Sequence, residues 1–399
     1  MREKNKDVCI IGGCGHVGLP LAIMLSYKGK DVVVYDISQE RIEKCAKGEM
    51  PFFEENADNI LKEVLEAGRL CFSNNPAVIQ EAHILILIVG TPVDKHLNPE
   101  FDAIKKSIED IERYLDDSQL LILRSTVYPG MTQKVRKWLE EKGKRLDIAF
   151  CPERILEGKA IKELTSLPQI ISSFTDSGIE KSKELFGALT NDMVVVEPME
   201  AELAKLYSNV WRYIKFAVSN QFYTMANDYG IDFYNVYHAM THNYSRCKDF
   251  PTPGFSAGPC LFKDTMQLGA FNNNNFNLGH AAMLINEGLP NYVFKQLKQN
   301  YDLSSKVIGI LGMTFKAESD DIRESLSYKV RKIAEFEARS ILCSDPYVNN
   351  SSFVSKEYLI EHSDIIIIAT PHKEYKELEI DSDKKVVDVW NLLGRGGRI

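Results

Sequence analysis

The chain has 399 residues, of which 44% are hydrophobic and 26% are charged, with a formal net charge of −8. This length predicts two or three domains, and the composition is that of an ordinary soluble globular protein. The acidic balance excludes nonspecific nucleic-acid binding, which needs a basic surface, and the apolar runs are too short to span a bilayer.

Cysteine and histidine usage predicts a protein without disulfides or a metal site. The eight cysteines form no C-x-x-C pair, a pattern typical of a reducing cytoplasm. His238 and His242 lie four residues apart, but no glutamate or third ligand accompanies them, so we interpret them as polar helix or loop residues. The N-terminus leads into a strand without a signal-peptide pattern. We therefore expect a cytoplasmic protein that holds no metal and binds neither a membrane nor nucleic acid.

The N-terminal segment predicts a dinucleotide-binding fold. Asp7–Gly12 is typical of a short buried strand, Gly13–Gly18 is a G-x-G-x-x-G, and Leu19–Leu25 has helical composition. The next predicted strand, Asp31–Tyr35, ends in Asp36. A glycine motif between a strand and a helix, with an acid after the second strand, is a specific signal, whereas the motif alone is weak. The alternative is a glycine-rich turn that holds no ligand.

Residues of this motif have separate roles in cofactor binding. Gly13 allows the turn, Gly15 lets the backbone approach a pyrophosphate at the helix N-terminus, and Gly18 lets the helix pack on the strand. Asp36 can accept hydrogen bonds from ribose hydroxyls and would repel a 2′-phosphate, which favours NAD over NADP. The expected cofactor contacts are Gly13, Gly15, His16, Val17, Gly18, Asp36, Arg41, Thr91 and Thr126.

Further apolar segments extend this domain to residue 196. We predict strands at Ile84–Val89, Leu120–Leu123, Ile148–Phe150 and Met193–Val196. Continuous apolar runs of this length are typical of a parallel sheet with helices on both faces, which predicts an α/β, doubly wound domain over residues 1–196. Thr91 and Thr126 follow two of these strands, at the edge where such sheets bind ligands.

Residues 197–300 predict a helical central domain. Glu200–Tyr229 lacks glycine and proline, so we expect a long central helix, a common place for dimer contact. Lys205 and Asn209 lie four residues apart and share a face, where a cation and an amide could stabilise an oxyanion. The alternative is a solvated face, but apolar neighbours favour a mostly buried helix. These neighbours are Leu203, Leu206, Val210, Phe216 and Val218.

Cys260 is the candidate nucleophile of this domain. The preceding segment, Pro253–Pro259, contains two glycines and two prolines and predicts a tight loop, and Pro259 suits the first position of a helix. The dipole and the free N–H groups of a helix N-terminus favour a thiolate. Lys263 and Asp264 lie one turn later and can share a face with the thiol. The alternative is a buried structural cysteine followed by a surface ion pair.

Residues 301–399 return to alternating strands and helices. We predict strands at Lys306–Gly312, Ile341–Pro346, Ile365–Ala369 and Val386–Val389, and a helix at Ser325–Arg339. The segment His362–Pro371 resembles Ala82–Pro92, but this region has no G-x-G-x-x-G. The pattern predicts a second, smaller Rossmann-like domain that holds a different, nucleotide-like ligand.

Several separated motifs resemble the UDP-glucose/GDP-mannose dehydrogenases, also called nucleotide-sugar 6-dehydrogenases. The resemblance covers nearly the whole chain, and motifs in the right order are more specific than any one of them. The motifs are Gly13–Gly18, Ser125–Val127, Pro152–Glu153, Ala201–Lys205 with Asn209, Gly258–Cys260 with Lys263 and Asp264, Phe315–Lys316 and Asp320–Arg323. The implied architecture is two Rossmann-like domains joined by the helical domain.

The resemblance implies an NAD-dependent, four-electron oxidation of a sugar C6 alcohol to a carboxylate. Cys260 would attack the aldehyde formed first and give a thiohemiacetal, whose oxyanion Lys205 and Asn209 would stabilise. The second oxidation would leave a thioester. Water would hydrolyse it with Asp264 as the base, while Thr126 and Glu157 help to place the water.

The resemblance also implies a set of substrate contacts. They are Glu153, Arg154, Glu157, Lys205, Asn209, Phe255, Gly258, Lys263, Phe315, Lys316 and Arg323. Arg323 would meet the diphosphate or nucleotide, from its own subunit or across a homodimer. Arg154 resembles members that oxidise UDP-N-acetylhexosamines, either mannosamine or glucosamine, for polysaccharide biosynthesis. Glu157 departs from several of those members, which carry proline there, so UDP-glucose and GDP-mannose stay open as substrates.

Two other functions compete with this one. A two-electron Rossmann dehydrogenase of the hydroxy-acid or 6-phosphogluconate type would also combine a Rossmann domain with a helical domain, but it leaves Cys260 without a role. A protein that senses NAD without chemistry would bind the cofactor and form no NADH. Replacement of Cys260 separates the four-electron from the two-electron dehydrogenase, since only the four-electron reaction needs the thiol.

Overall fold

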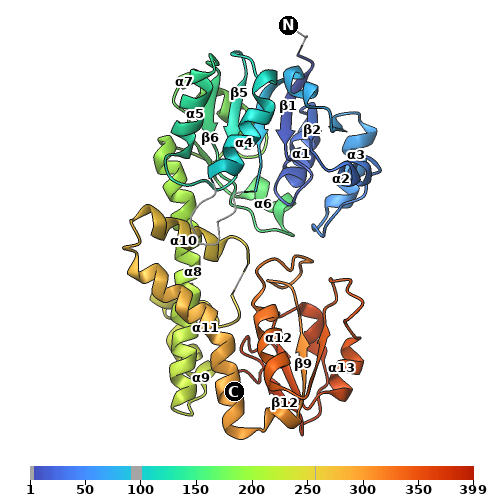
Figure 1. The fold of residues 1–399 in the computed structure, drawn as a ribbon, viewed down its shortest axis with the longest axis vertical. Helices are drawn as coiled ribbons and strands as arrows, with labels where there is room; N and C mark the ends of the chain where they lie inside the picture. Colours follow the sequence, from blue (N-terminus) through green and yellow to red (C-terminus); the bar gives the residue numbers. More distant parts are fainter. Residues whose placement is uncertain (1–3, 91–100, 257) are drawn as a thin grey trace. The chain divides into compact units, whose positions relative to one another are not determined.

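The computed structural model describes residues 4–90, 101–256 and 258–399. It divides into two compact units, Met1–Ser208 and Asn209–Ile399 (Figure 1). The division falls inside a long helix, and the expected three-domain boundaries at residues 196 and 300 stay a prediction. Thr91, an expected cofactor contact, lies outside the described residues.

The first unit contains a six-stranded parallel sheet in the order β3-β2-β1-β4-β5-β6. Its elements are β1 (Lys6–Ile11), α1 (Gly18–Tyr27), β2 (Val32–Tyr35), α2 (Gln39–Ala46), α3 (Ala57–Glu66), β3 (Leu70–Ser73), β4 (Ala82–Leu87), α4 (Phe101–Ile111), β5 (Leu120–Leu123), α5 (Met131–Glu141), β6 (Asp147–Phe150), α6 (Ala160–Ser166), β7 (Gln169–Ile171), α7 (Asp176–Gly187), β8 (Met193–Val195) and α8 (Pro198–Asp228).

Both faces of this sheet are buried, as the apolar runs predict. On β1, Val8 and Ile10 enter one hydrophobic cluster, while Cys9 and Ile11 enter another on the opposite face. Ile10 pairs with β2 on one side and with β4 on the other. The strand order therefore reverses between β1 and β4. In doubly wound sheets such a reversal opens a ligand crevice at the carboxyl ends of the strands.

The prediction that Met193–Val196 joins the main sheet is wrong. β8 pairs with β7 in a separate two-stranded sheet. A single antiparallel bridge, Ala149 to Ser173, connects β6 to the segment after β7. Val194 and Val195 are 47% and 43% exposed. β8 is three residues long and lies outside the main sheet, whose two faces are covered by helices. Its apolar composition therefore does not indicate burial.

Helix α8 confirms the predicted long central helix. A glutamate of α8 also caps the N-terminus of another helix, α5. Buried Glu202 accepts hydrogen bonds from the Gly130 N–H at 2.5 Å and from the Thr132 N–H at 2.8 Å. These N–H groups lie at the start of α5, where backbone donors have no partner inside the helix. Burial raises the pKa of Glu202 above its usual value, while these hydrogen bonds act in the opposite direction. Glu202 thus caps α5.

The second unit contains a four-stranded parallel sheet in the order β10-β9-β11-β12, beside helices. Its elements after α8 are α9 (Phe233–Thr241), α10 (Leu261–Phe271), α11 (Asn277–Asn300), β9 (Val307–Leu311), α12 (Leu326–Glu337), β10 (Ser340–Ser344), α13 (Lys356–His362), β11 (Ile365–Ile368) and β12 (Lys385–Val387). The predicted second Rossmann-like sheet is confirmed, and its order also reverses, between β9 and β11.

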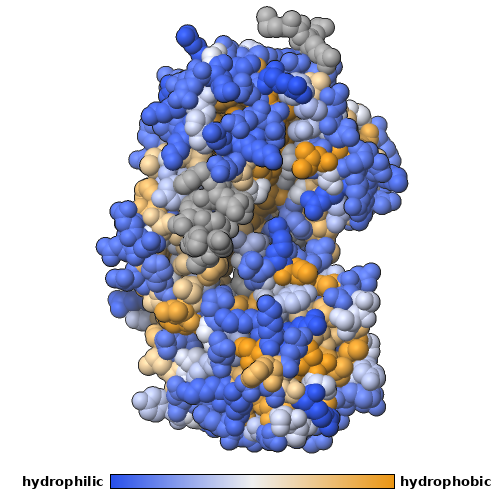
Figure 2. Space-filling view, in the orientation of Figure 1, coloured by the Kyte–Doolittle hydropathy of each residue, from blue (hydrophilic) through white to orange (hydrophobic). Residues whose placement is uncertain are grey.

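The surfaces agree with the composition. Hydrophilic residues cover most of the face seen in Figure 2. Across the described ranges, every helix is either too short or too polar to pass through a bilayer.

We predict that Glu202→Ala lowers the free energy of unfolding by about 1–3 kcal/mol, because it leaves buried N–H groups at the start of α5 without an acceptor. Denaturant unfolding followed by circular dichroism measures this loss. Glu141→Ala, at the exposed end of the same helix, is the control and should change stability by less than about 0.5 kcal/mol. Equal effects of the two substitutions would contradict the capping role.

Candidate functional site

The glycine-rich turn of the first unit has the shape that a pyrophosphate needs. A side-chain carbon on Gly18 would lie 2.5 Å from the Gly13 Cα, so only glycine lets α1 start this close to the turn. A side-chain carbon on Gly15 would meet no atom within 4 Å. The backbone is therefore open on the side where α1 begins, with Val17 as its N-cap. A helix N-terminus of this kind favours an anionic ligand.

Asp36 lies beside this turn with hydrogen-bonding capacity to spare. Its carboxylate accepts hydrogen bonds from the Cys14 N–H and the Ser38 N–H, each at 2.9 Å. A carboxylate has about four acceptor positions, so hydroxyl groups of a ribose could still bind. The side chain is only 8% exposed, and Arg41 stands exposed on the following helix, α2. The residues of the first unit thus fit NAD.

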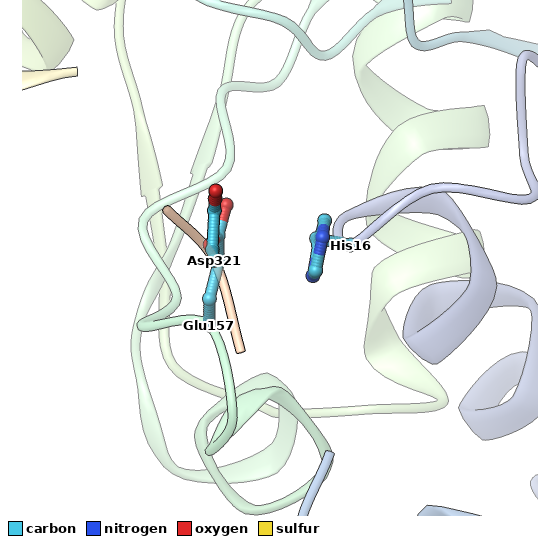
Figure 3. Close-up of side chains that lie close together, drawn as sticks. All are labelled: His16, Glu157 and Asp321. Carbon is cyan, nitrogen blue, oxygen red and sulfur yellow. The ribbon is translucent and has the colours of Figure 1, made fainter. Parts of the chain in front are cut away.

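His16 and Glu157 come together although they are far apart in the sequence. A ring nitrogen of His16 and a carboxylate oxygen of Glu157 lie within 4.8 Å of one another (Figure 3). The His16 ring also packs on Phe52, with centroids 4.0 Å apart. Glu157 therefore faces the glycine-rich turn, on the cofactor side of its loop. Asp321, drawn in the same figure, belongs to the second unit.

The acidic loop after β6 is built around a buried ion pair. Arg124 is fully buried, donates a hydrogen bond to the Cys151 carbonyl at 2.9 Å and pairs with the carboxylate of Glu153. Glu153 also accepts hydrogen bonds from the N–H groups of Arg154 and Ile155, at 2.7 and 3.0 Å. This carboxylate therefore fixes the path of the loop, and its expected sugar contact stays a prediction.

Two neighbours of this ion pair carry other expected roles. The Arg154 guanidinium donates a hydrogen bond to the Pro168 carbonyl, and its side chain is half-buried. Thr126 is half-buried just after β5, while the adjacent Ser125 hydroxyl accepts a hydrogen bond from the Val89 N–H at 3.0 Å. Both residues lie at the carboxyl edge of the sheet, as expected.

In the second unit, Cys260 is the N-cap residue of α10 and is exposed. The expectation that Pro259 takes the first helical position is wrong, because the helix begins two residues later, at Leu261. The thiol thus stands at the N-terminus of the helix, where the dipole favours a negative charge. Its exposure contradicts the alternative of a buried structural cysteine.

Asn209 and Asp264, separated by 55 positions, meet in the interior of the second unit. The Asn209 amide donates a hydrogen bond of 2.6 Å to Asp264 Oδ2, and both residues are buried. Within the described residues, Asp264 Oδ1 accepts no hydrogen bond, and the Lys263 ammonium lies 3.6 Å from it. A buried carboxylate with one oxygen that accepts no hydrogen bond is a candidate general base.

Helix α8 is buried on one face rather than mostly buried. Leu206 and Val210 belong to the interior, whereas Val218 is exposed. Lys205 is half-buried on this helix and belongs to the first unit. Its role in oxyanion stabilisation stays a prediction.

The remaining expected substrate residues occupy loops of the second unit. Phe255 is buried in its hydrophobic core. Phe315 packs against Gly258, where a side-chain carbon would lie 2.6 Å from the ring, and the Lys316 ammonium lies 5.8 Å from the ring centre. Arg323 binds Asp321 through its Nε, at 2.9 and 3.0 Å from the two oxygens. Their ligand contacts stay predictions.

Asp345, the acid that follows β10 in the second sheet, is enclosed by protein groups, unlike Asp36. Asp345 accepts hydrogen bonds from the N–H groups of Met313 and Tyr347, at 2.6 and 2.8 Å, and fully buried His372 lies 3.2 Å away. Burial alone would raise the pKa of Asp345, but His372 and the N–H donors hold it below its usual value. Since protein groups occupy this carboxylate, the second Rossmann-like sheet does not offer it to a ribose.

Arg124 and Glu54 are structural residues of this region that the sequence analysis missed. Glu54 is buried and accepts a hydrogen bond of 2.8 Å from the Gly158 N–H, beside Glu157. Arg124 had a detectable signal, since a charge directly after an apolar strand and before Ser125 has no place in an ordinary core. Glu54 lies in a polar segment and had none.

Family models for the UDP-glucose/GDP-mannose dehydrogenase family match three parts of the chain. The NAD binding domain matches residues 6–190, the central domain residues 199–288, and the UDP binding domain residues 309–395.

Individual relatives and structures agree with these matches. The UDP-N-acetyl-D-mannosamine dehydrogenase of Pyrococcus horikoshii is 31% identical over 96% of this chain and 94% of its own length. A solved structure of UDP-D-ManNAc dehydrogenase from Pyrococcus horikoshii has a TM-score of 0.87 at 30% identity, covering 94% of this chain and 91% of that one. A UDP-glucose dehydrogenase structure from Pyrobaculum islandicum, at 24% identity and TM-score 0.89, covers 97% and 95% and shows the shared fold.

We predict that Glu153→Ala costs about 3–5 kcal/mol of unfolding free energy, because it leaves the buried Arg124 charge without its carboxylate. Chemical denaturation measures the cost. Glu66→Ala, an exposed residue at the end of α3, serves as the control. If Glu153→Ala weakened substrate binding while stability stayed at the wild-type value, the structural role of this carboxylate would be refuted.

Proposed function

The chain belongs to the UDP-glucose/GDP-mannose dehydrogenase family of NAD-dependent nucleotide-sugar oxidoreductases, and on that premise we propose that it oxidises the C6 alcohol of a UDP-N-acetylhexosamine to the uronic acid. UDP-N-acetyl-D-mannosamine is the first choice and UDP-N-acetylglucosamine the second. The relatives named for the mannosamine substrate, and Arg154 in the acidic loop, support this choice. The observation that carries the chemistry is the exposed Cys260 thiol at the N-terminus of α10.

The proposed reaction uses the thiol to divide a four-electron oxidation into two steps. Loss of a hydride and a proton turns the alcohol into an aldehyde, and the Cys260 thiolate adds to the carbonyl carbon. Loss of a second hydride converts the resulting thiohemiacetal into a thioester. Water then displaces the thiolate and leaves the carboxylate; one proton of the water passes to a base and the other leaves with the ionisation of the acid to solvent. NAD, when bound, supplies the acceptor for each of the two hydrides.

The residues of the chain would hold charge and protons during these steps. In this proposal Asp264 takes the proton of the attacking water through Oδ1, which accepts no hydrogen bond within the described residues, while Asn209 holds its other oxygen. In this proposal Lys205 and Asn209 stabilise the oxyanion, and Thr126 and Glu157 help to place the water. The glycine-rich turn and Asp36 would hold the pyrophosphate and ribose of NAD.

UDP-glucose, or GDP-mannose, is the alternative substrate. Glu157 supports it, because this acid is retained where several acetylhexosamine members carry proline. We also propose that the enzyme acts in the cytoplasm. Its product, with either substrate, would be a nucleotide-linked uronic acid that serves polysaccharide biosynthesis.

We also propose a homodimer that forms through α8. One face of this helix exposes large apolar residues at helical spacing, and such a face on a soluble protein marks an interaction surface. The residues of this α8 stripe, which extends one residue beyond the helix, are Trp211, Val218, Phe222, Met225 and Tyr229. Trp211 alone is 57% exposed.

The function is tested by a panel of UDP- and GDP-sugars, with NADH followed by its absorbance. We expect the UDP-N-acetylhexosamines to give two NADH per sugar and the acid product. Cys260→Ser should abolish the acid, and Asp264→Asn should lower kcat by about 10²- to 10⁴-fold. Cys247→Ser is the matched control. A signal with UDP-glucose alone would refute the sugar assignment, and one NADH per sugar would refute the four-electron reaction.

The dimer is tested separately by light scattering after size exclusion. The wild-type protein should show twice the 45.3 kDa mass of one chain, and Trp211→Asp should shift the mass toward a single chain. Phe336→Asp is the control, since Phe336 is 88% exposed on α12, outside the α8 stripe. A wild-type monomer, or an unchanged dimer in Trp211→Asp, would contradict this interface.

A further inference from the structure

Gly254 is enclosed by the indole of Trp390. A side-chain carbon on Gly254 would overlap the six-membered ring of Trp390, so the backbone at this position lies flat against the indole. Any residue larger than glycine would have to displace either the ring or the loop. Gly254 stands six positions before Cys260, in the loop that leads to the thiol.

Asn220 of α8 holds the same glycine on its polar side. Asn220 Oδ1 accepts a hydrogen bond from the Gly254 N–H at 2.8 Å, and the side-chain amide of Asn220 donates to the Gly254 carbonyl at 3.1 Å. The amide also donates to Asn286 Oδ1 at 2.9 Å, and the Asn286 amide donates to the Tyr213 carbonyl at 3.1 Å. Asn220 and Asn286 are fully buried. The orientation of Asn220 is therefore fixed by α11 and by α8 itself.

Trp390 is itself fixed on the turn that follows β12. Its indole Nε1–H donates a hydrogen bond to the Ala369 carbonyl at 3.0 Å, at the end of β11. The neighbouring Val389 carbonyl accepts a hydrogen bond of 2.7 Å from the Tyr234 hydroxyl of α9. The ring thus extends from the carboxyl edge of the second Rossmann-like sheet and contacts the same glycine that Asn220 binds.

We infer that Trp390 is a positioning residue for Cys260 and acts through Gly254. The inference rests on the proposed function of Cys260 as the nucleophile. The indole and the paired amide of Asn220 fix the position of Gly254, and a fixed point six residues before the thiol limits where Cys260 can lie. Displacement of a reacting group by about 1 Å can cost about 100-fold in rate. Trp390 also joins the sheet that matches a UDP binding domain to the loop that leads to the thiol.

The test compares Trp390→Leu with Trp138→Leu, a control for the loss of a half-buried tryptophan in the first unit. We expect Trp390→Leu to lower kcat by about 10- to 100-fold, with the KM for NAD and the Tm close to wild-type values. It should also change the alkylation rate of Cys260 by iodoacetamide about tenfold, measured by mass spectrometry, while the rate at Cys247 stays constant. Wild-type kcat and alkylation in Trp390→Leu would overturn the inference.

Gly254→Ala provides a second, independent measurement. Its added methyl group should lower kcat and change Cys260 alkylation, and Trp390→Leu in the same chain should partly restore both, because the smaller side chain makes room. Strictly additive effects would overturn the inference. If Trp390→Leu does not fold, Gly254→Ala alone decides: a lower kcat and a changed rate of Cys260 alkylation at a wild-type Tm support the inference, and wild-type values of both overturn it.

The alkylation measurement also separates this inference from the proposed function. If the wild-type protein gave no NADH with any sugar of the panel, the proposed function would fail. The coupling between Trp390 and Cys260 would still be decided by the alkylation rates.

Discussion

The buried hydrogen bond between the Asn209 amide and the Asp264 carboxylate joins α8 to α10, and the arrangement of the proposed catalytic groups of the second unit depends on it. It holds Asp264 Oδ2, while the other oxygen, Oδ1, is buried 3.6 Å from the Lys263 ammonium. A buried carboxylate without such a donor would be costly, because its charge would lack compensation. The same bond fixes the start of α10, and the exposed thiol of Cys260 stands at that start.

The two Rossmann-like sheets use the same topology for different purposes. Each has a strand-ending acid beside the turn that follows its first strand. Asp36 keeps acceptor positions open at its turn, whereas Asp345 is enclosed by backbone N–H groups and His372. The fold alone would allow a dinucleotide in either unit. The protein donors around Asp345 leave Asp36 as the acid with acceptor positions for a ribose, and the unit that contains it matches an NAD binding domain.

The parts of the fold that could be predicted from the sequence are those with a strong local signal. Leu120–Leu123 forms β5 over the predicted residues, because a fully buried parallel strand is apolar on both faces. The position of Cys260 at a helix N-terminus could be predicted because glycine and proline interrupt regular structure just before it and helical spacing follows it. Contacts between distant residues have no such signal. The pairing of Asn209 with Asp264, of Arg124 with Glu153 and of Trp390 with Gly254 depends on how elements pack. The wrong prediction for β8 has the same origin, since three consecutive apolar residues look the same in the sequence whether the strand lies in the main sheet or outside it.

The buried ion pair beneath the acidic loop has a consequence for protein engineering. The loop that follows β6 faces the cofactor side through Glu157, so it invites exchange with the corresponding loop of a relative to alter sugar preference. Its conformation, however, is fixed by Arg124, which directly follows β5 and lies outside any such graft. A transplanted loop that lacks an acid at position 153 would leave the buried Arg124 guanidinium without a carboxylate partner. Such chimaeras must therefore exchange residue 124 together with the loop.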